Sequence, residues 1–446
     1  MSSVPVVIVA ELTGRADPRL RRGAPGFRRV GVAMFAAGAA IFALLYSPQA
    51  VLPALSAAFA VPPARAGLAM SLATAALAVA VLPASALSER WGRGGVLVGS
   101  VGLAAVLGVL LPLCPSYPVL LAVRALQGLA MAGMPGVAMA YLVDEIHPSA
   151  LAGAVGTFVA GNGLGGLTGR LLAGLATDLG GWRAGLGAVS ALSAGCAVAF
   201  TLLLPPQRNA LPQRNASAAS SGSGGGALRR HLTDPGLRRL YLAGFVLMAG
   251  FVTVYNYLGY RLLRPPFALS PGWVGLIFLT YLVGTAASAV AGRLADRYGA
   301  RVVLAGAVLL AILAALATAS SSLPAVLAGL ALMTAGFFAA HAVTSGWVGR
   351  LAHRARGQAA GLYLLAYYTG SSLGGWVGGL VFERAGWSAT IAYVVVMFAA
   401  ALAPVLTGSG RGGNRRAPAP PAASRDSPVQ LEPSATALPP VQAGQP

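Results

Sequence analysis

The sequence predicts an all-α membrane protein with twelve spanning helices arranged in two lobes of six. Two observations predict this class. Of the 446 residues, 57% are hydrophobic and only 9% are charged, whereas soluble globular chains carry about 25% charged residues. The apolar residues are also gathered into twelve stretches of about the twenty residues that a helix needs to cross a bilayer. A soluble multidomain enzyme is therefore excluded, and a lipid bilayer is expected around the chain.

The first six stretches make up the first predicted lobe, residues 30–204, and the other six make up the second, residues 240–407. The stretches of the first lobe are residues 30–52, 66–87, 95–113, 119–142, 152–175 and 184–204. Those of the second lobe are residues 240–260, 272–292, 302–319, 324–346, 358–381 and 388–407. Residues 66–87 give the weakest signal, because Pro83 and several small residues dilute their hydrophobicity.

Three segments outside the lobes have a different composition. Residues 1–29 form a basic arm whose short apolar run lacks the basic leading region of a signal peptide. Residues 205–239 contain the run Ser217–Gly226, rich in Ser and Gly, and residues 408–446 are rich in Pro, Ala and Gly. Such compositions have little apolar surface to bury, so a flexible linker and a disordered tail are expected.

The distribution of arginine predicts the orientation of the helices. The chain has no Lys, so all 31 basic residues are Arg, and with 11 acids the formal net charge is +20. If the N-terminus is cytoplasmic, 24 arginines lie on the cytoplasmic side, five lie in outer loops, and Arg124 and Arg170 lie inside spans. Loops rich in arginine stay in the cytoplasm. Both termini are thus predicted to be cytoplasmic, and the charge reflects topology rather than a nucleic-acid partner.

A charged loop occurs twice, between the second and third spans of each lobe. Its shared pattern is an acid followed by Arg, an aromatic residue and Gly, with a further Arg behind. The copies are Glu89, Arg90, Gly92 and Arg93 in the first lobe, and Asp296, Arg297, Gly299 and Arg301 in the second. Gly permits the tight turn, the acid can face a helix N-terminus, and the Arg can pair with an acid. Such a loop can latch one conformation of a two-lobed protein.

The repeated loop resembles motif A of the major facilitator superfamily, a G-x-x-x-D-R-x-G-R pattern. The first copy departs from this pattern at Ser85, Glu89 and Gly94. The resemblance implies the superfamily fold of two six-helix lobes. It also implies that Arg90 has an acidic partner at the cytoplasmic end of the fourth span, where this chain has Asp144.

Two other segments resemble motifs of the same superfamily. Residues 124–128 (RALQG) resemble motif B, whose intramembrane arginine, here Arg124, is implicated in proton coupling. Residues 161–170 (GNGLGGLTGR) resemble the antiporter motif C, with Gly166 in place of its Pro and Arg170 in place of its last Gly. A glycine face lets two helices approach closely. In the family this seam is thought to seal a leak path in exporters.

Four stretches are similar to the YnfM-like, acriflavine-sensitivity group of bacterial efflux proteins. They are residues 161–170, 255–262, 335–341 and 364–375. The resemblance implies a multi-pass protein of the bacterial inner membrane that exports drug-like solutes in exchange for protons. A weaker internal repeat is also visible, since Gly181-Trp182 after the fifth span matches Gly386-Trp387 after the eleventh.

The polar residues inside the spans suggest the class of solute. None of the eleven acids lies well inside a span, so a cationic solute would have no buried anion to compensate its desolvation. Arg can bind a carboxylate or phosphate through two hydrogen bonds. We therefore expect a neutral or anionic small molecule. The candidate substrate or coupling residues are Arg124, Gln127, Asn162, Arg170, Tyr255, Asn256, His341 and Tyr367.

Each candidate also has a structural alternative. Arg124 and Arg170 could cap carbonyl groups, and Arg170 could extend to the outer interface. His341 is a candidate proton relay, because the ordinary titration range of histidine suits that role, but a single buried histidine is more often a hydrogen-bonded core residue. Tyr367 and Phe337 could line a cavity or simply pack between helices.

Together these patterns predict a secondary active transporter that works by alternating access, with proton-coupled efflux as the leading mechanism. The alternative is a facilitator or importer of a sugar, an amino acid or an organic anion with the same fold. No G-x-x-x-x-G-K phosphate loop occurs in the sequence, and no metal cluster or nucleophile–base pair lies in the spans. We expect no enzyme activity, cofactor, metal or nucleic-acid partner, and a monomer that handles a small molecule and protons.

Overall fold

The computed structural model describes residues 19–206, 224–352 and 356–406. Within these ranges the chain is helical and contains no strand, only one isolated bridge between Leu20 and Ile146. This confirms the all-α class. The start of the basic arm (1–18), much of the predicted linker (207–223) and the predicted tail (408–446) lie outside the described residues.

The described residues belong to one compact unit. Within it, first lobe and second lobe now denote all described residues of 19–206 and 224–406, which include parts of the predicted arm and linker. The first lobe contains α2 (Pro25–Tyr46), α3 (Pro48–Phe59), α4 (Pro63–Ala66), α5 (Leu68–Trp91), α6 (Arg93–Leu110), η1 (Leu111–Leu113), α7 (Tyr117–Met131), α8 (Gly133–Glu145) and α9 (Pro148–Leu203). The second contains α11 (Gly224–Thr233), α12 (Pro235–Leu262), α13 (Pro271–Leu276), η2 (Ile277–Leu279), α14 (Thr280–Tyr298), α15 (Ala300–Ala317), α16 (Leu323–Leu351), α17 (Arg356–Thr369), the π-helical turn η3 (Gly370–Gly374), α18 (Gly375–Ala400) and α19 (Ala403–Leu406).

Ten helical stretches of the described residues are long and apolar enough to cross a membrane. Two of them have 56 and 50 residues, more than twice the length of about twenty residues that a span needs. Each turns at one glycine with a positive φ, Gly181 (69°) in the first lobe and Gly386 (71°) in the second. Divided there, the ten stretches become twelve segments. The twelve crossings and the cytoplasmic termini remain predictions.

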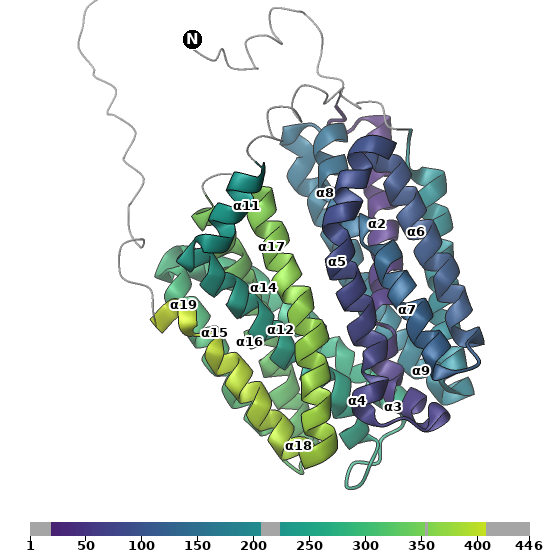
Figure 1. Cartoon of the computed structure of the whole chain (residues 1–446), viewed down its shortest axis with the longest axis vertical. Coiled ribbons are helices and arrows are strands. Elements are labelled where there is room, and N and C mark those ends of the chain that lie inside the picture. Colours follow the sequence, from purple (N-terminus) through teal and green to yellow (C-terminus); the bar gives the residue numbers. More distant parts are fainter. Residues whose placement is uncertain (1–18, 207–223, 353–355, 407–446) are drawn as a thin grey trace, which may run out of the picture. The chain divides into compact units, whose positions relative to one another are not determined.

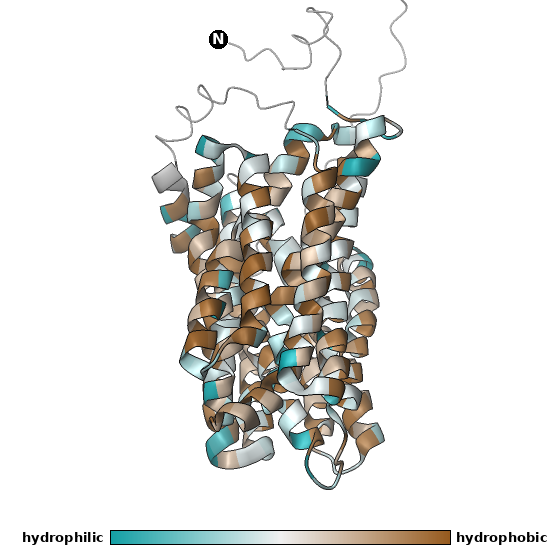
Figure 2. Cartoon of the chain, turned by 90° about the vertical axis from the view of Figure 1, so that its right-hand side faces the viewer, coloured by the Kyte–Doolittle hydropathy of each residue, from teal (hydrophilic) through white to brown (hydrophobic). Residues whose placement is uncertain are grey.

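Large hydrophobic side chains lie on the outside of the helices. Val79, Leu202 and Val302 are among them, with 71%, 71% and 65% of their surface exposed. Figure 2 shows hydrophobic residues along the length of the helices and hydrophilic residues gathered near both ends. An exposed apolar surface of this extent is a contact surface for another apolar phase, which here is the lipid of a bilayer.

The two ends of the helices differ in charge, and we name them accordingly. The arginine-rich end carries the repeated charged loops, with Arg93 and Arg297, and also α11 with Arg230. The arginine-poor end carries the turns at Gly181 and Gly386. In Figure 1, α8 and α11 lie toward the arginine-rich end, whereas α3 and α4 lie at the opposite end.

The repeated loop has the same backbone conformation in both lobes. Gly92 has φ 80° and ψ 142°, and Gly299 has φ 88° and ψ 145°. Each glycine follows an aromatic residue and immediately precedes the next helix. Residues with a Cβ rarely adopt such φ values, which explains the glycine in both copies. The sequence repeat is thus a structural repeat, as expected for a fold built from related halves.

A row of glycines brings α9 into direct contact with the backbone of α2. A Cβ added to Gly161, Gly165 or Gly169 would lie 2.3, 2.4 or 2.6 Å from backbone atoms of α2. These distances are far shorter than an ordinary van der Waals contact. The close helix approach expected from the motif C resemblance is therefore present, and it fixes the position of the helix that carries Arg170.

Hydrogen bonds join the two lobes toward the arginine-poor end. The hydroxyl groups of Ser71 and Ser372 each donate to the other residue's carbonyl oxygen, at 2.9 and 2.7 Å. The carboxylate of Asp178 accepts from the backbone N–H of Gly272 at 2.8 Å and from the hydroxyl of Ser270 at 2.9 Å. A conformation that opens this end must break these bonds.

The glycine row can be tested by substitution. Gly165→Ala should lower the free energy of unfolding by about 1–3 kcal/mol, because the added methyl group overpacks the α2–α9 contact. Gly163→Ala is the matched control, since it lies two residues away on the same segment of α9 with no atom within 4 Å of the added Cβ. Thermal unfolding in detergent compares the two. Equal melting temperatures for both variants would contradict the close contact.

Candidate functional site

A cavity of about 620 Å³ lies between the two lobes. The first lobe contributes α2, α3 and α9 to its wall, and the second contributes α12, α14, α16 and α17. The lining extends from Arg170 toward the arginine-rich end, as far as Gly156 and Ser288. A volume of this size is within the usual range of small-molecule sites.

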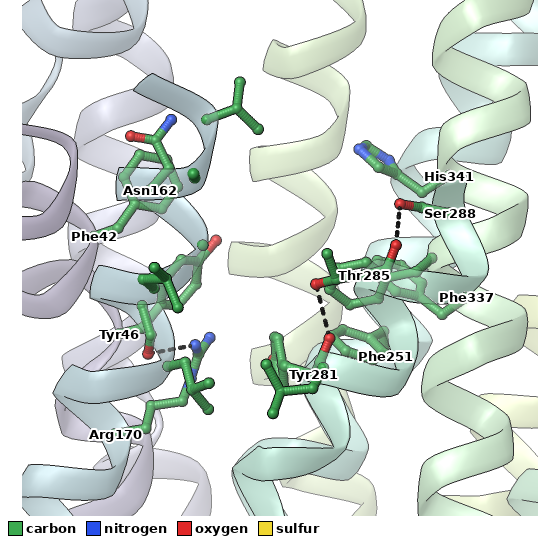
Figure 3. A pocket seen from close by; sticks show the side chains of 18 of the residues that line it. Phe42, Tyr46, Asn162, Arg170, Phe251, Tyr281, Thr285, Ser288, Phe337 and His341 are labelled. Carbon is green, nitrogen blue, oxygen red and sulfur yellow. Dashed lines mark hydrogen bonds between the residues drawn. The ribbon is translucent and has the colours of Figure 1, made fainter. Parts of the chain in front are cut away.

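Aromatic side chains form much of the cavity wall. They are Phe42, Tyr46, Phe251, Tyr281, Phe337, Phe338 and Tyr367. Phe251 and Phe337 are stacked with ring centroids 3.8 Å apart, and Tyr281 meets Phe338 edge-on at 5.5 Å. Figure 3 shows Phe42 and Tyr46 on one side of the cavity and Phe251, Tyr281 and Phe337 on the other. Such walls favour a flat apolar or amphiphilic solute.

Among the described residues that line the cavity, Arg170 is the one with a permanently charged side chain. It is only 3% exposed. Its Nε donates to Gln49 Oε1 and its Nη1 to the carbonyl oxygen of Gly166, both at 2.8 Å. The guanidinium carbon lies 4.2 Å from the ring centroid of Tyr46 and 4.5 Å from that of Tyr281, which gives favourable cation–π contacts.

No carboxylate neutralises Arg170 in the part of the chain that the structure describes, and the ion pair of Arg93 with Asp144 lies far away at the arginine-rich end. The lining of the cavity likewise includes no Asp or Glu. A buried positive charge without a counterion is strongly unfavourable in a membrane interior. The cavity therefore attracts anions and repels cations.

Gln49 connects Arg170 with the opposite lobe. Its amide oxygen accepts from Arg170, while its amide nitrogen donates to Asn256 Oδ1 on α12 at 2.7 Å. All three side chains are at least 96% buried. A change in the contacts of Arg170 thus acts directly on a hydrogen bond between the lobes.

The second lobe supplies polar groups on the facing wall. His341 Nδ1 shares a hydrogen bond of 2.9 Å with the hydroxyl of Tyr363. The imidazole ring also packs against Tyr367 at 4.7 Å and Phe337 at 6.0 Å. Ser288 lines the cavity nearby, as Figure 3 shows. This wall is uncharged when the histidine is neutral.

The structure brings four of the eight predicted substrate or coupling residues to the cavity. They are Asn162, Arg170, His341 and Tyr367. The oxygen of Asn162 is buried next to Gly38 without a hydrogen-bond partner. The other four, Arg124, Gln127, Tyr255 and Asn256, do not line the cavity, and their contacts give the reason.

Arg124 lies inside the first lobe and is fully buried. It donates to the carbonyl oxygens of Ala69, Leu44 and Leu45 at 2.8, 3.1 and 2.9 Å, and to Gln127 Oε1 at 2.5 Å. These bonds join α7 to α2 and α5 and use most of the guanidinium donors. Arg124 and Gln127 therefore do not reach the cavity in this conformation, and their contacts fit the structural alternative; a role in coupling remains a prediction.

Tyr255 and Asn256 support the site from behind its wall. The hydroxyl of Tyr255 shares hydrogen bonds with Thr280 and Thr334, each at 2.6 Å. Asn256 accepts from Gln49, and its own amide nitrogen has no partner. Neither side chain is therefore a direct solute contact in this conformation.

The sequence analysis missed several lining residues. They are Gln49, Phe251, Tyr281, Thr285 and Ser288, together with Tyr46. The helical spacing of two groups among them could have predicted their position in the cavity wall. Tyr46 and Gln49 are three residues apart, and Tyr281, Thr285 and Ser288 are four and three residues apart, so each group lies on one helix face. Polar groups aligned along one face of a span indicate a surface that avoids lipid.

In the charged loop of the first lobe, the arginine that pairs with Asp144 is not the one that the motif A resemblance implies. Arg93, not Arg90, forms an ion pair with Asp144, and it also donates to the carbonyl oxygen of Ala140 at 2.6 Å. The positive φ of Gly92 turns the chain so that Arg93 begins α6 beside α8. Arg90 remains in the last turn of α5 and is exposed, as is Glu89. The expected partner of Asp144 is corrected accordingly.

The second copy of the loop makes fewer contacts in this conformation. Asp296, Arg297 and Gly299 are exposed. The guanidinium carbon of Arg301 lies 6.0 Å from the ring centroid of Trp347. The role of these residues as a conformational latch remains a prediction.

A comparison with known families identifies the fold. The family model described as the Major Facilitator Superfamily matches residues 30–264 and 240–440. The chain belongs to the Major Facilitator Superfamily. It is therefore a multi-pass membrane protein that transports a small molecule, and its relatives are transporters rather than enzymes.

Individual members of the superfamily are similar over most of the chain. The "inner membrane transport protein YnfM" of Escherichia coli (strain K12) is 41% identical over 383 residues, which cover 86% of this chain and 91% of that protein. The "uncharacterized MFS-type transporter YybF" of Bacillus subtilis (strain 168) is 38% identical over 383 residues, covering 86% and 94%. The resemblance to the YnfM-like group is thus confirmed.

A crystal structure also shares the fold. It is that of a bacterial homologue of the human lysosomal transporter Spinster, in an inward-facing and unoccupied conformation. Its TM-score is 0.69 at 18% identity, and the match covers 86% of this chain and 96% of that one. At this identity the likeness supports the superfamily fold alone.

The corrected ion pair leads to a prediction. Arg93→Gln should reduce the free energy of unfolding by about 1.5–3 kcal/mol, the range for hydrogen bonds to charged groups, because it leaves Asp144 half-buried without its partner. Thermal unfolding in detergent measures the change. The control is Arg90→Gln, an exposed residue three positions earlier, which should stay within about 0.5 kcal/mol of the original chain. A larger loss for the Arg90 variant would contradict the assignment.

Proposed function

We propose that the chain exports a small amphiphilic solute, neutral or anionic, across the bacterial inner membrane in exchange for protons. One observation carries the proposed solute class. The cavity between the lobes is mainly apolar and rich in aromatic side chains, and its charged lining residue, Arg170, is cationic and has no acidic partner among the described residues. A cationic drug would enter such a site without a compensating anion.

The proposed mechanism is alternating access around this cavity. We assign the arginine-rich end to the cytoplasm, because arginine-rich loops stay on that side. The hydrogen bonds of Ser71 with Ser372 and of Asp178 with Gly272 join the lobes at the opposite end. Glu89 and Asp296 are exposed at the arginine-rich end. These features fit an inward-facing state in which the acids of the charged loops are exposed and Arg93 pairs within its own lobe.

Proton coupling is proposed to involve His341. It lines the cavity, and histidine is the side chain whose ordinary titration range lies near physiological pH. Its hydrogen bond with Tyr363 and its contact with Tyr367 place the imidazole in the wall of the second lobe. The likeness to the YnfM-like group favours efflux over uptake. Because one chain contains the whole cavity, a monomer is sufficient for transport.

A second candidate function is a proton-independent facilitator or importer of a sugar, an amino acid or an organic anion. Arg170 is compatible with an organic anion moving in either direction. The cavity wall argues against a sugar, because most of its lining side chains are apolar. The two functions differ in their response to a pH gradient.

Flux from proteoliposomes tests the proposal. The purified chain is reconstituted, and the vesicles are loaded with benzoate, tryptophan, uridine, benzamide and glucose, whose loss is followed by mass spectrometry. We expect loss of an aromatic neutral or anionic compound that is several-fold faster when the external side is acidic, because inward proton flow then drives export. Loaded vesicles without protein and loaded vesicles with the His341→Gln variant are the controls. The flux through the variant should no longer depend on the pH gradient.

Two results would contradict the proposal. Exchange that is equally fast with and without the gradient, and without proton movement, would favour the facilitator. Flux of glucose alone would contradict the solute class argued from the aromatic wall.

A further inference from the structure

We infer that the cavity binds an aromatic monocarboxylate, with the carboxylate on Arg170 and the ring between the aromatic walls of the two lobes. This inference rests on the proposed function, since it names the substrate class of the same cavity. It depends on three features, which are the free capacity of the guanidinium, its single charge, and the position of the rings around it.

The guanidinium of Arg170 has capacity for a further acceptor. Arginine carries five N–H donors, and the described neighbours that accept from Arg170 are Gln49 Oε1, the carbonyl oxygen of Gly166 and the hydroxyl of Tyr281. All three acceptors are neutral, and they leave donors free. A carboxylate would supply the missing negative charge and could form the planar pair of hydrogen bonds for which the guanidinium is suited. The ligand group that best satisfies this site is therefore a carboxylate.

The single cation limits the ligand to one negative charge. Arg170 has no second Arg beside it in the lining of the cavity, and the residues around it are largely apolar. A dianion would leave its second charge desolvated without a partner, which is strongly unfavourable. A cationic ligand would be repelled by the positive charge of the guanidinium. A monoanion is thus preferred over a dianion and over a cation.

The aromatic groups lie where the ring of such a ligand would be. Tyr46 and Tyr281 flank the guanidinium from opposite lobes, at 4.2 and 4.5 Å. Beyond them Phe251 and Phe337 form a stacked pair in the second lobe. Figure 3 shows this arrangement around Arg170. A ligand whose carboxylate and ring are directly attached contacts both the cation and the walls.

Binding at Arg170 would also act on the contact between the lobes. A carboxylate on the Nε edge of the guanidinium uses a free Nη donor and takes the Nε donor from Gln49, which is the residue that donates to Asn256 across the interface. A ligand favours the conformation in which it makes the better contacts. The carboxylate therefore weakens one of the hydrogen bonds that hold the lobes together near the arginine-poor end.

Equilibrium binding to the full-length chain in detergent tests this inference, with isothermal titration calorimetry at pH 7.5 as the readout. The probes are benzoate, benzamide and acetate, which separate the charge from the ring. We expect benzoate to bind at least about tenfold more tightly than either other probe, equivalent to about 1.4 kcal/mol. Arg170→Gln should reduce benzoate affinity by about tenfold or more and leave benzamide affinity unchanged.

The control is Arg183→Gln, which removes the same charge at an exposed position outside the cavity, just after the turn at Gly181. It should bind benzoate like the original chain. Arg170→Lys keeps the charge but loses the planar pair of N–H donors, so its affinity for benzoate should be intermediate. This variant replaces Arg170→Gln in the test if Arg170→Gln does not fold.

The inference is overturned if benzamide binds the original chain as tightly as benzoate, or if acetate does. It is also overturned if Arg170→Gln retains full benzoate affinity or, where that variant does not fold, if Arg170→Lys binds benzoate as tightly as the original chain. Failure of the proposed export function can be distinguished from failure of the carboxylate site, because binding of benzoate requires no pH gradient. Benzoate binding without flux in proteoliposomes would contradict export alone, whereas flux of other solutes without benzoate binding would contradict the carboxylate site alone.

Discussion

The buried guanidinium of Arg170 is the constraint on which the site depends. A positive charge in a membrane interior requires compensation, and here it comes from three neutral oxygens and two tyrosine rings instead of a carboxylate. Two departures from the motif C pattern meet at this point, since Arg170 stands in place of its last Gly and donates to the carbonyl oxygen of Gly166, which stands in place of its Pro. The same substitution that weakens the resemblance to an antiporter seam thus creates the cationic site.

The glycine row and the interlobe hydrogen bonds position this charge. Gly161, Gly165 and Gly169 bring α9 against α2, so that the aromatic ring of Tyr46 lies beside the guanidinium. Gln49 then connects the charge with Asn256 in the other lobe. The cation is therefore part of the cavity and of the lobe contact, which lets one ligand influence both.

Much of the fold followed from the sequence, because membrane insertion requires long apolar stretches and loops with a charge bias. The repeated glycines also corresponded to real turns, since Gly92 and Gly299 share one unusual φ. The site was harder to predict. Arg124 and Arg170 are equivalent by sequence, both single arginines within apolar spans, and only tertiary packing shows that carbonyl oxygens surround the first while the second reaches the cavity. The ion pair of Asp144 depended on the turn at Gly92, which moved the partner from Arg90 to Arg93.

The central claim is that a ligand on Arg170 loosens the contact between the lobes at the arginine-poor end. Pulsed electron paramagnetic resonance tests it most directly, with spin labels at Leu179 and Trp273, which are 89% and 65% exposed and adjoin Asp178 and Gly272. Cys114 and Cys196 are replaced first. The account predicts that benzoate shifts the distribution toward longer distances in the original chain and leaves it unchanged in Arg170→Gln. An equal shift in both proteins, or no shift in either, would contradict the account.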